Sequence, residues 1–175
     1  MLERPSGPVT AGTVAAVMTD EQVAAFLQGV ELAAVAVYDQ AADVLGSPAA
    51  VAAARAFVAH HRAHGRAFAA LAGAHAVSAA PTATVAALQS TALLVSEHDG
   101  LVLLAALESR VAATQHAMLG HLASTPAITL VATTLPVECQ HGVVLGTLLS
   151  QQLAQLVPAT QGDDGHLVPQ PLSGP

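Results

Sequence analysis

The amino-acid sequence predicts an all-α protein, a four-helix bundle built from two antiparallel hairpins with a long crossover connection between them. Hydrophobic residues make up 53% of the 175 residues and aromatic residues only 2%. The apolar content is therefore mostly Ala, Val and Leu, and Ala and Leu are strong helix formers. Helix-capping signals stand before four long apolar stretches. One longer segment separates the second stretch from the third, as in bundles with a crossover.

The first hairpin is predicted from its capping signals. A capping box at Thr19 opens a helix that should run to about Leu45, because the Thr hydroxyl and a Gln three residues later satisfy free backbone N–H groups. Ser47 caps the next helix, with Pro48 at its first position, where a missing N–H does no harm. This helix should end near Leu71. The short link makes the two helices antiparallel neighbours.

The second hairpin follows a longer connection, residues 73–96, in which a short helix is expected around Val85–Leu94. A serine cap opens the third long helix, which should run to about residue 122. A cap followed by proline at Thr125-Pro126 opens the fourth, which should run to about residue 156.

We therefore expect one domain over residues 19–156 and an extended Pro/Gly-rich tail over residues 157–175. The N-terminal apolar run Val9–Met18 is short and interrupted, so it is not a convincing signal peptide. One Cys cannot form an intrachain disulfide, which fits a reducing compartment. These features favour a cytoplasmic protein, with a removed signal segment as the alternative. Polar residues interrupt the most apolar stretch, Pro126–Leu149, so no membrane span is expected.

Composition and charge exclude some partners. The net charge is −7, and the five basic residues are all Arg, so no basic patch is available to neutralise nucleic-acid phosphates or anionic membranes. With no Trp and one Tyr, stacking on bases is nearly ruled out. Several predicted helices are apolar around much of their circumference, which implies a second buried face, most simply a homodimer interface.

Three carboxylates stand in apolar surroundings. Glu31 is the only charged residue between Glu21 and Asp39, and Glu138 is the only one between residues 111 and 162. Glu108 has mostly Leu, Val and Ala one helical turn away on either side. An unpaired buried carboxylate costs several kcal/mol or takes up a proton, whereas buried charges commonly coordinate metals.

The spacing of Glu and His strengthens this prediction. Residues 138–141 read Glu-x-x-His and residues 61–64 read His-x-x-His, so each pair leaves one face of its helix. Glu31 precedes this first pair by 30 and 33 residues, and Glu108 precedes the second pair by the same intervals. The pattern predicts an interior metal site, with hydrogen-bonded core residues as the alternative. Its predicted ligands are Glu31, His61, His64, Glu108, Glu138 and His141.

At these residues the chain resembles the ferritin-like di-iron carboxylate superfamily, and more closely the bacterial ferritin-like domain proteins of uncharacterised function. That superfamily places one Glu on each of two helices and a Glu-x-x-His on each of the others. Glu31 and Glu108 match the single Glu positions, His64 matches the first His, and Glu138 with His141 match the second pair. The resemblance covers roughly residues 19–156 and implies two metal ions, with iron first and manganese, zinc or copper as alternatives.

His61 departs from this pattern, because it stands where the family has a Glu that bridges both metals. The site then has three carboxylates and three imidazoles, which lowers its negative charge and should favour a lower total metal charge. Only Glu138 is left to bridge from these positions. His60 could substitute for His61 if the helix were rotated, but the 30/33 spacing favours His61.

Other residues near the predicted ligands have either a functional or a purely structural role. Tyr38 lies two turns from Glu31 and could donate to a ligand or act as a redox tyrosine, although a packed Tyr with a bonded hydroxyl is favoured. Gln115 and His116 could hydrogen-bond the ligands or have ordinary polar roles. Cys139 is interpreted as a small buried residue, and Pro136 should kink its helix.

The sequence is compatible with three functions. The resemblance implies a di-iron oxidoreductase of the ferroxidase type. The His61 departure favours a metal carrier, sensor or storage subunit without catalysis, binding zinc, copper or manganese. A metal-free helical interaction module that has kept only the fold is the third.

Overall fold

The structure, a computed structural model, describes residues 18–89, 91–152, 156 and 165–169. These residues form five α-helices and no strand, so the predicted all-α class is confirmed. The helices are α1 (Asp20–Ala41), α2 (Pro48–Ala72), α3 (Thr82–Leu88), α4 (Glu97–Leu119) and α5 (Thr125–Leu148). Short 3₁₀ turns follow α1 at Ala42–Val44 and α2 at Gly73–His75.

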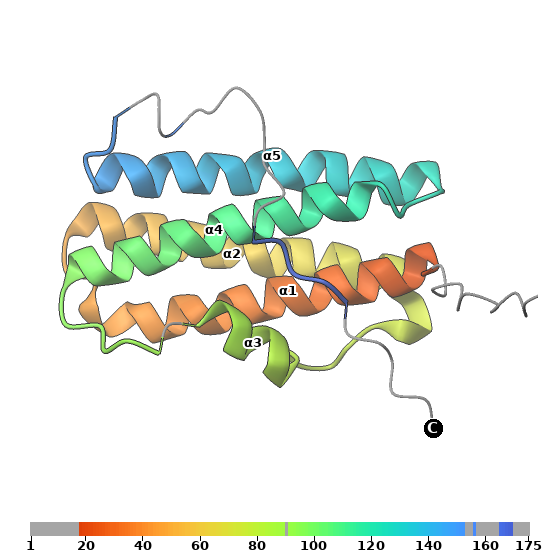
Figure 1. Cartoon of the computed structure of the whole chain (residues 1–175), viewed down its shortest axis with the longest axis horizontal. Helices are drawn as coiled ribbons and strands as arrows, with labels where there is room; N and C mark the ends of the chain where they lie inside the picture. Colours follow the sequence, from red (N-terminus) through yellow and green to blue (C-terminus); the bar gives the residue numbers. More distant parts are fainter. Residues whose placement is uncertain (1–17, 90, 153–155, 157–164, 170–175) are drawn as a thin grey trace, which may run out of the picture.

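The four long helices lie side by side (Figure 1). α1 packs along α2 and α4 along α5, and the two pairs meet where α1 contacts α4 and α2 contacts α5. The connection from α2 to α4 runs back along the molecule, so that α4 begins at the end where α2 begins (Figure 1). Its short helix α3 packs on α1.

Most predicted helix starts are observed. At Thr19 both bonds of the capping box form, and Ser47 caps α2 by accepting the N–H of Ala50. The start of α5 differs by one residue, because Ser124 rather than Thr125 is the cap.

The predicted ends of three long helices were too late. α1 ends at Ala41 instead of Leu45, because residues 42–44 tighten into a 3₁₀ turn. α4 ends at Leu119 rather than near residue 122. α5 ends at Leu148 instead of residue 156, and Ser150 two residues later has a left-handed backbone (φ 58°) that a helix cannot continue through. The short helix also lies earlier than predicted, directly after Pro81.

Two acidic residues tie the hairpins together in equivalent ways. Asp20, at the start of α1, accepts the backbone N–H groups of Ser124 and the residue before it, at 2.7 and 2.9 Å. Glu97, at the start of α4, accepts those of Ser47 and the residue before it, at 2.6 and 2.7 Å. The two acids, Asp20 and Glu97, are 77 residues apart, and so are their partners Ser47 and Ser124. The two hairpins are therefore related by an approximate twofold repeat.

The apolar core consists of two clusters. One includes Leu27, Phe68 and Met118, and the other includes Leu104 and Leu145. Along α2 and α5 the predicted Glu and His ligands lie in sequence between residues of the two clusters. A polar layer is thus enclosed by apolar packing on both sides, which removes it from water.

One helix among the described residues, α5, is long and apolar enough to cross a membrane by length and composition alone. Core helices of soluble proteins pass the same test, so this is weak support for a span. Only 28% of its most apolar window is buried within this chain, and Ile128 and Val144 are among its exposed residues.

Part of the predicted tail contacts the helices. The backbone N–H of Leu167, a buried residue, donates to the Thr114 hydroxyl at 2.9 Å. Arg110 donates to the Gly165 carbonyl at 3.2 Å and also to the carbonyl of Ala87 in α3. Residues 157–164 and 170–175 lie outside the described residues, so the prediction of an extended tail stays open there.

Candidate metal centre

The six predicted ligands converge in the middle of the four long helices. Five of them are at most 2% exposed, and His64 is 14% exposed. The prediction that the three carboxylates face inward and meet is therefore confirmed. α1 supplies Glu31, α2 His61 and His64, α4 Glu108, and α5 Glu138 and His141.

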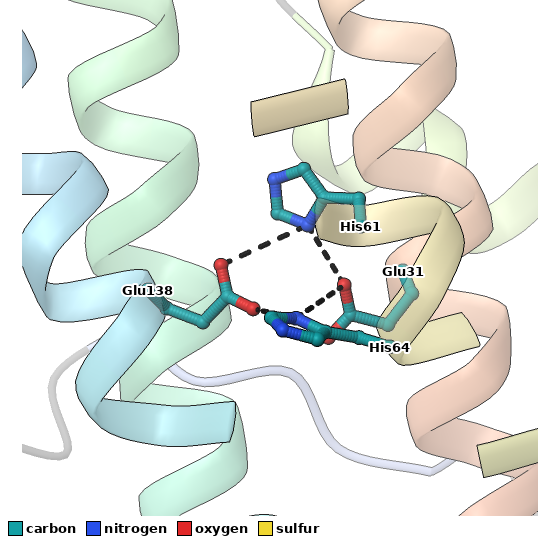
Figure 2. A group of neighbouring side chains, drawn as sticks. All are labelled: Glu31, His61, His64 and Glu138. Atoms are coloured by element: carbon teal, nitrogen blue, oxygen red, sulfur yellow. Dashed lines mark hydrogen bonds and ion pairs between the residues drawn. The ribbon is translucent and has the colours of Figure 1, made fainter. Parts of the chain in front are cut away.

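Four of the residues form a first group that could hold a metal ion: Glu31, His61, His64 and Glu138. Figure 2 shows Glu31 and Glu138 reaching toward each other from opposite sides, with both imidazoles at their carboxylates. Nδ1 of His61 lies 2.7 Å from a Glu31 oxygen, and Nδ1 of His64 lies 2.6 Å from Oε1 of Glu138. The two remaining nitrogen–oxygen contacts are 3.7 and 3.9 Å.

A second group of four could hold an ion beside the first: His61, Glu108, Glu138 and His141. Nε2 of His61 lies 3.2 Å from Oε1 of Glu108. Nδ1 of His141 lies 3.3 Å from Oε2 of Glu108 and 3.1 Å from Oε2 of Glu138. His61 and Glu138 belong to both groups.

These separations suit metal ligands. Ligand atoms about 2.0–2.1 Å from a tetrahedral ion stand roughly 3.4 Å apart. The nitrogen–oxygen contacts within the second group are 3.1–3.7 Å, and those within the first are 2.6–3.9 Å. Small side-chain adjustments would bring the first group to the same spacing.

His61 is the centre of the polar layer. Its Nδ1 faces the carboxylate of Glu31 and its Nε2 that of Glu108. Burial opposes a positive charge on this ring, but the adjacent carboxylates outweigh burial and raise the pKa of His61 well above its ordinary value. Without a metal, an imidazolium ring therefore compensates the carboxylates from within.

The carboxylates differ in their electrostatics. Burial, followed by the negative charge of Glu138, raises the pKa of Glu31 to about 6. Burial also opposes ionisation of Glu138, but the adjacent imidazoles of His141 and His64 lower its pKa below the ordinary value. Oε2 of Glu138 is within ion-pair distance of His141, yet it has no partner with hydrogen-bond geometry among the described residues. A buried carboxylate oxygen in this state retains a lone pair for a cation.

Two further side chains hold the single Glu residues in place. The Tyr38 hydroxyl of α1 donates to Glu108 of α4. Conversely, Nε2 of Gln115 in α4 donates to Glu31 of α1 at 2.8 Å, and its oxygen accepts from the Thr134 hydroxyl at 2.8 Å. The Tyr38 hydroxyl is bonded, as favoured from the sequence, but its partner is a candidate ligand, so the bond fits the alternative of a donor to the ligands equally well. Gln115 is likewise a buried partner of a candidate ligand.

The repeat relates these supports as it relates the ligands. Tyr38 lies seven residues after Glu31, and Gln115 lies seven residues after Glu108, so the two supports are also 77 residues apart. Each donates a hydrogen bond to the single Glu of the other hairpin. The sequence could have shown this, because the interval between Glu31 and Glu108 is also 77.

Two glycines extend the same pattern and were missed from the sequence. Gly65 and Gly142 each follow the second His of a pair. A Cβ on Gly65 would meet Cβ of Glu31 at 3.5 Å, and one on Gly142 would meet Cβ of Glu108 at 3.9 Å. Small residues at these positions let the two helices of each hairpin approach closely beside the site.

His60 lies on the outer side of the centre. It is not a member of either group, so the choice of His61 over His60 agrees with the structure. Its Nδ1 nevertheless contacts Nε2 of His141 at 2.9 Å, and Phe57 stacks on the His141 ring at 4.0 Å. These contacts orient His141 with Nδ1 toward the carboxylates.

Two predictions on α5 have mixed outcomes. Pro136 lies inside the helix, and the kink expected there stays a prediction; the Thr134 hydroxyl donates to carbonyls of the preceding turn. Cys139, interpreted from the sequence as a small buried residue, is only half-buried, and burial raises the pKa of its thiol. It belongs to neither metal-ligating group.

A separate cavity of about 490 Å³ lies between α1, α3 and residues 166–169. Its lining is largely apolar and includes none of the six ligands. The chemistry-bearing groups are therefore in the polar layer and not in this cavity.

No family model, curated protein or solved structure significantly matches this chain. The functional interpretation consequently depends on the residues themselves. A buried Glu/His cluster could hold a metal ion, and neither the identity nor the number of ions follows from the fold.

Proposed function

We propose that this protein is a ferritin-like four-helix bundle that binds two metal ions in its interior. The observation that carries the proposal is the pair of buried four-residue groups that share His61 and Glu138. Ligands for the two ions would be Glu31, His61, His64, Glu108, Glu138 and His141.

The cost of burying charge supports this proposal. Three carboxylates taken out of water need compensation, and breaking or omitting that compensation costs several kcal/mol. Glu31 resists ionisation, and Glu138 has a buried oxygen without a hydrogen-bond partner among the described residues. Divalent cations at the two groups would compensate the charge of Glu31 and would bind the unpartnered oxygen of Glu138.

The donor set limits the identity of the metal. Carboxylate oxygens and imidazole nitrogens suit iron, manganese, zinc and copper, whereas calcium and magnesium prefer oxygen alone. Iron is our first choice because of the resemblance to di-iron carboxylate proteins. Bound iron would supply oxygen- or peroxide-dependent redox chemistry, so we propose a ferroxidase-type oxidoreductase, with a zinc, copper or manganese carrier or sensor as the alternative.

The direct test is elemental analysis of protein purified without added metal, followed by titration of the metal-free chain with Fe(II), Mn(II), Zn(II) and Cu(II). Two ions per chain are expected. His141→Ala should lose metal, whereas His75→Ala, an exposed histidine outside the cluster, should bind like the wild type. Fe(II) oxidation by the loaded chain would separate an oxidoreductase from a carrier. Absence of binding by every metal would refute the proposal.

A metal-free helical module is the second candidate, favoured by one observation. His61 contacts carboxylates through both ring nitrogens, so much of the polar layer is paired without any ion. Chelation would then leave the melting temperature unchanged.

The exposed apolar side chains of α5 support a further proposal, that a second copy of the chain covers this helix. Val144 and Ile128 are exposed on this helix at 41% and 39%. A dimer in sedimentation experiments that a Val144→Glu substitution converts to monomer would agree with this; a monomeric wild type would refute it.

A further inference from the structure

We infer that His61 bridges the two metal ions, with Nδ1 bound to one ion and Nε2 to the other. This inference rests on the proposed two-metal function and assigns to an imidazole the position at which the ferritin-like pattern has a bridging carboxylate.

The orientation of the ring is the first observation. Nδ1 of His61 lies 2.7 Å from Glu31, which belongs only to the first group. Nε2 lies 3.2 Å from Glu108, which belongs only to the second group. The two nitrogens of one imidazole point in divergent directions, so each faces a different group.

The position of the other imidazoles is the second observation. Nδ1 of His64 contacts Glu138 through Oε1, and Nδ1 of His141 contacts it through Oε2. Each of these rings therefore serves one group. Only His61 and Glu138 stand between the groups, and both present two ligand atoms.

Charge balance is the third argument. Binding through both nitrogens requires that both ring protons leave to solvent, because a metal ligand must be deprotonated. The ring is then an imidazolate with one negative charge. Together with three carboxylates it carries four negative charges, which two divalent cations neutralise within a buried layer. A neutral His61 on a single ion would leave one positive charge buried without compensation.

The bridge determines the distance between the ions. Two metal–nitrogen bonds of about 2.0–2.1 Å on opposite sides of the ring place the ions roughly 6 Å apart. In two-metal sites without such a ring the ions are about 3.5–4 Å apart. The metal–metal distance thus separates the two arrangements.

The first experiment is a crystal structure of the full wild-type chain loaded with Zn²⁺, with the ions located by anomalous scattering at the zinc edge. We expect two ions roughly 6 Å apart, with His61 between them. Two ions closer than about 4 Å with His61 on one of them would overturn the bridge while leaving the proposed two-metal site intact. A single ion per chain would overturn both the bridge and the proposed two-metal site, and a chain that binds none of Fe(II), Mn(II), Zn(II) and Cu(II) would overturn metal binding altogether.

The second experiment compares three variants by calorimetric titration with Zn²⁺. His64→Ala should lose one ion and keep the other, and so should His141→Ala. His61→Ala should weaken both ions by at least tenfold, and millimolar imidazole should restore them, because the free ring can enter the space that the substitution leaves. Loss of only one ion from a folded His61→Ala chain would overturn the inference.

His61→Glu is the matched control for folding and charge. It restores the four carboxylates of the ferritin-like pattern. Two zinc ions are expected in this variant too, but at the shorter distance of about 3.5–4 Å. An unchanged distance between the wild type and this variant would show that the ring does not separate the ions.

Discussion

Replacing Glu31 with Gln should stabilise the metal-free protein at neutral pH, even though it removes a predicted ligand. Glu31 is 1% exposed, and burial is the largest cause that raises its pKa from 4.5 to about 6. A native state with a raised carboxyl pKa binds a proton more readily than the unfolded chain does. The wild type therefore loses stability as the pH rises from about 4.5 to about 6, and the full penalty is present at pH 7.

The size of the effect follows from the same pKa. At about 1.4 kcal/mol for each pKa unit, ionising Glu31 in the folded protein costs on the order of 2 kcal/mol. For a chain of this length each kcal/mol changes the melting temperature by about 2–4 °C. Glu31→Gln should thus raise the melting temperature of the metal-free protein by about 4–8 °C at pH 8, with a smaller gain at pH 5.

The matched control is Glu138→Gln. Burial opposes the ionisation of Glu138, yet the imidazoles of His141 and His64 lower its pKa, so its charged form stabilises the native state above the ordinary pKa. Glu138→Gln should consequently lower the melting temperature at pH 8. Differential scanning calorimetry of both chelated variants at pH 5 and pH 8 measures the contrast. Equal destabilisation by both substitutions, or a Glu31→Gln gain that does not depend on pH, would refute the reasoning.

Three other predictions concern stability. Saturating the wild-type chain with its metal at about 100 times the Kd should stabilise it by about 2.7 kcal/mol, and a chelator should reverse the increase in melting temperature; no shift would indicate the metal-free module. Gln115→Leu should destabilise the chain by about 1–3 kcal/mol in denaturant titration, because Glu31 and Thr134 each lose a buried partner; a neutral result would mean that the layer rearranges. Gly100→Ala should cost about 1–3 kcal/mol by the same measurement, since its Cβ would stand 2.8 Å from Cγ2 of Val44. Gly120→Ala is the mild comparison, because its Cβ would stand 3.8 Å from the carbonyl oxygen of Ala117.

Local sequence signals predicted the helix starts better than the helix ends. Caps such as Thr19 and Ser47 use a side chain that bonds a backbone N–H within the next turn, so a few residues decide them. The end of α5 at Leu148 was missed by eight residues. Apolar periodicity continues beyond it, and the left-handed backbone at Ser150 has no glycine to indicate it.

The candidate site was predicted for a physical reason that applies to few sites. Glu31, Glu108 and Glu138 stand in long apolar helices, where a lone charge requires a partner, and the equal intervals to His pairs imply that the hairpins are equivalent. The sequence did not predict that Tyr38 would bond Glu108 and Gln115 would bond Glu31, each in the other hairpin. Sequence spacing places residues on a face of one helix but does not say which neighbouring helix that face meets.

By itself the sequence determined the all-helical class, the positions of most caps and the set of Glu and His residues that face the interior, because each depends on contacts within a few helical turns. The tertiary structure decided that these residues form two groups sharing His61 and Glu138. It also decided that the His61 ring presents one nitrogen to each side. These features depend on the rotation and separation of helices that are distant in sequence, which only the packing of the whole layer specifies.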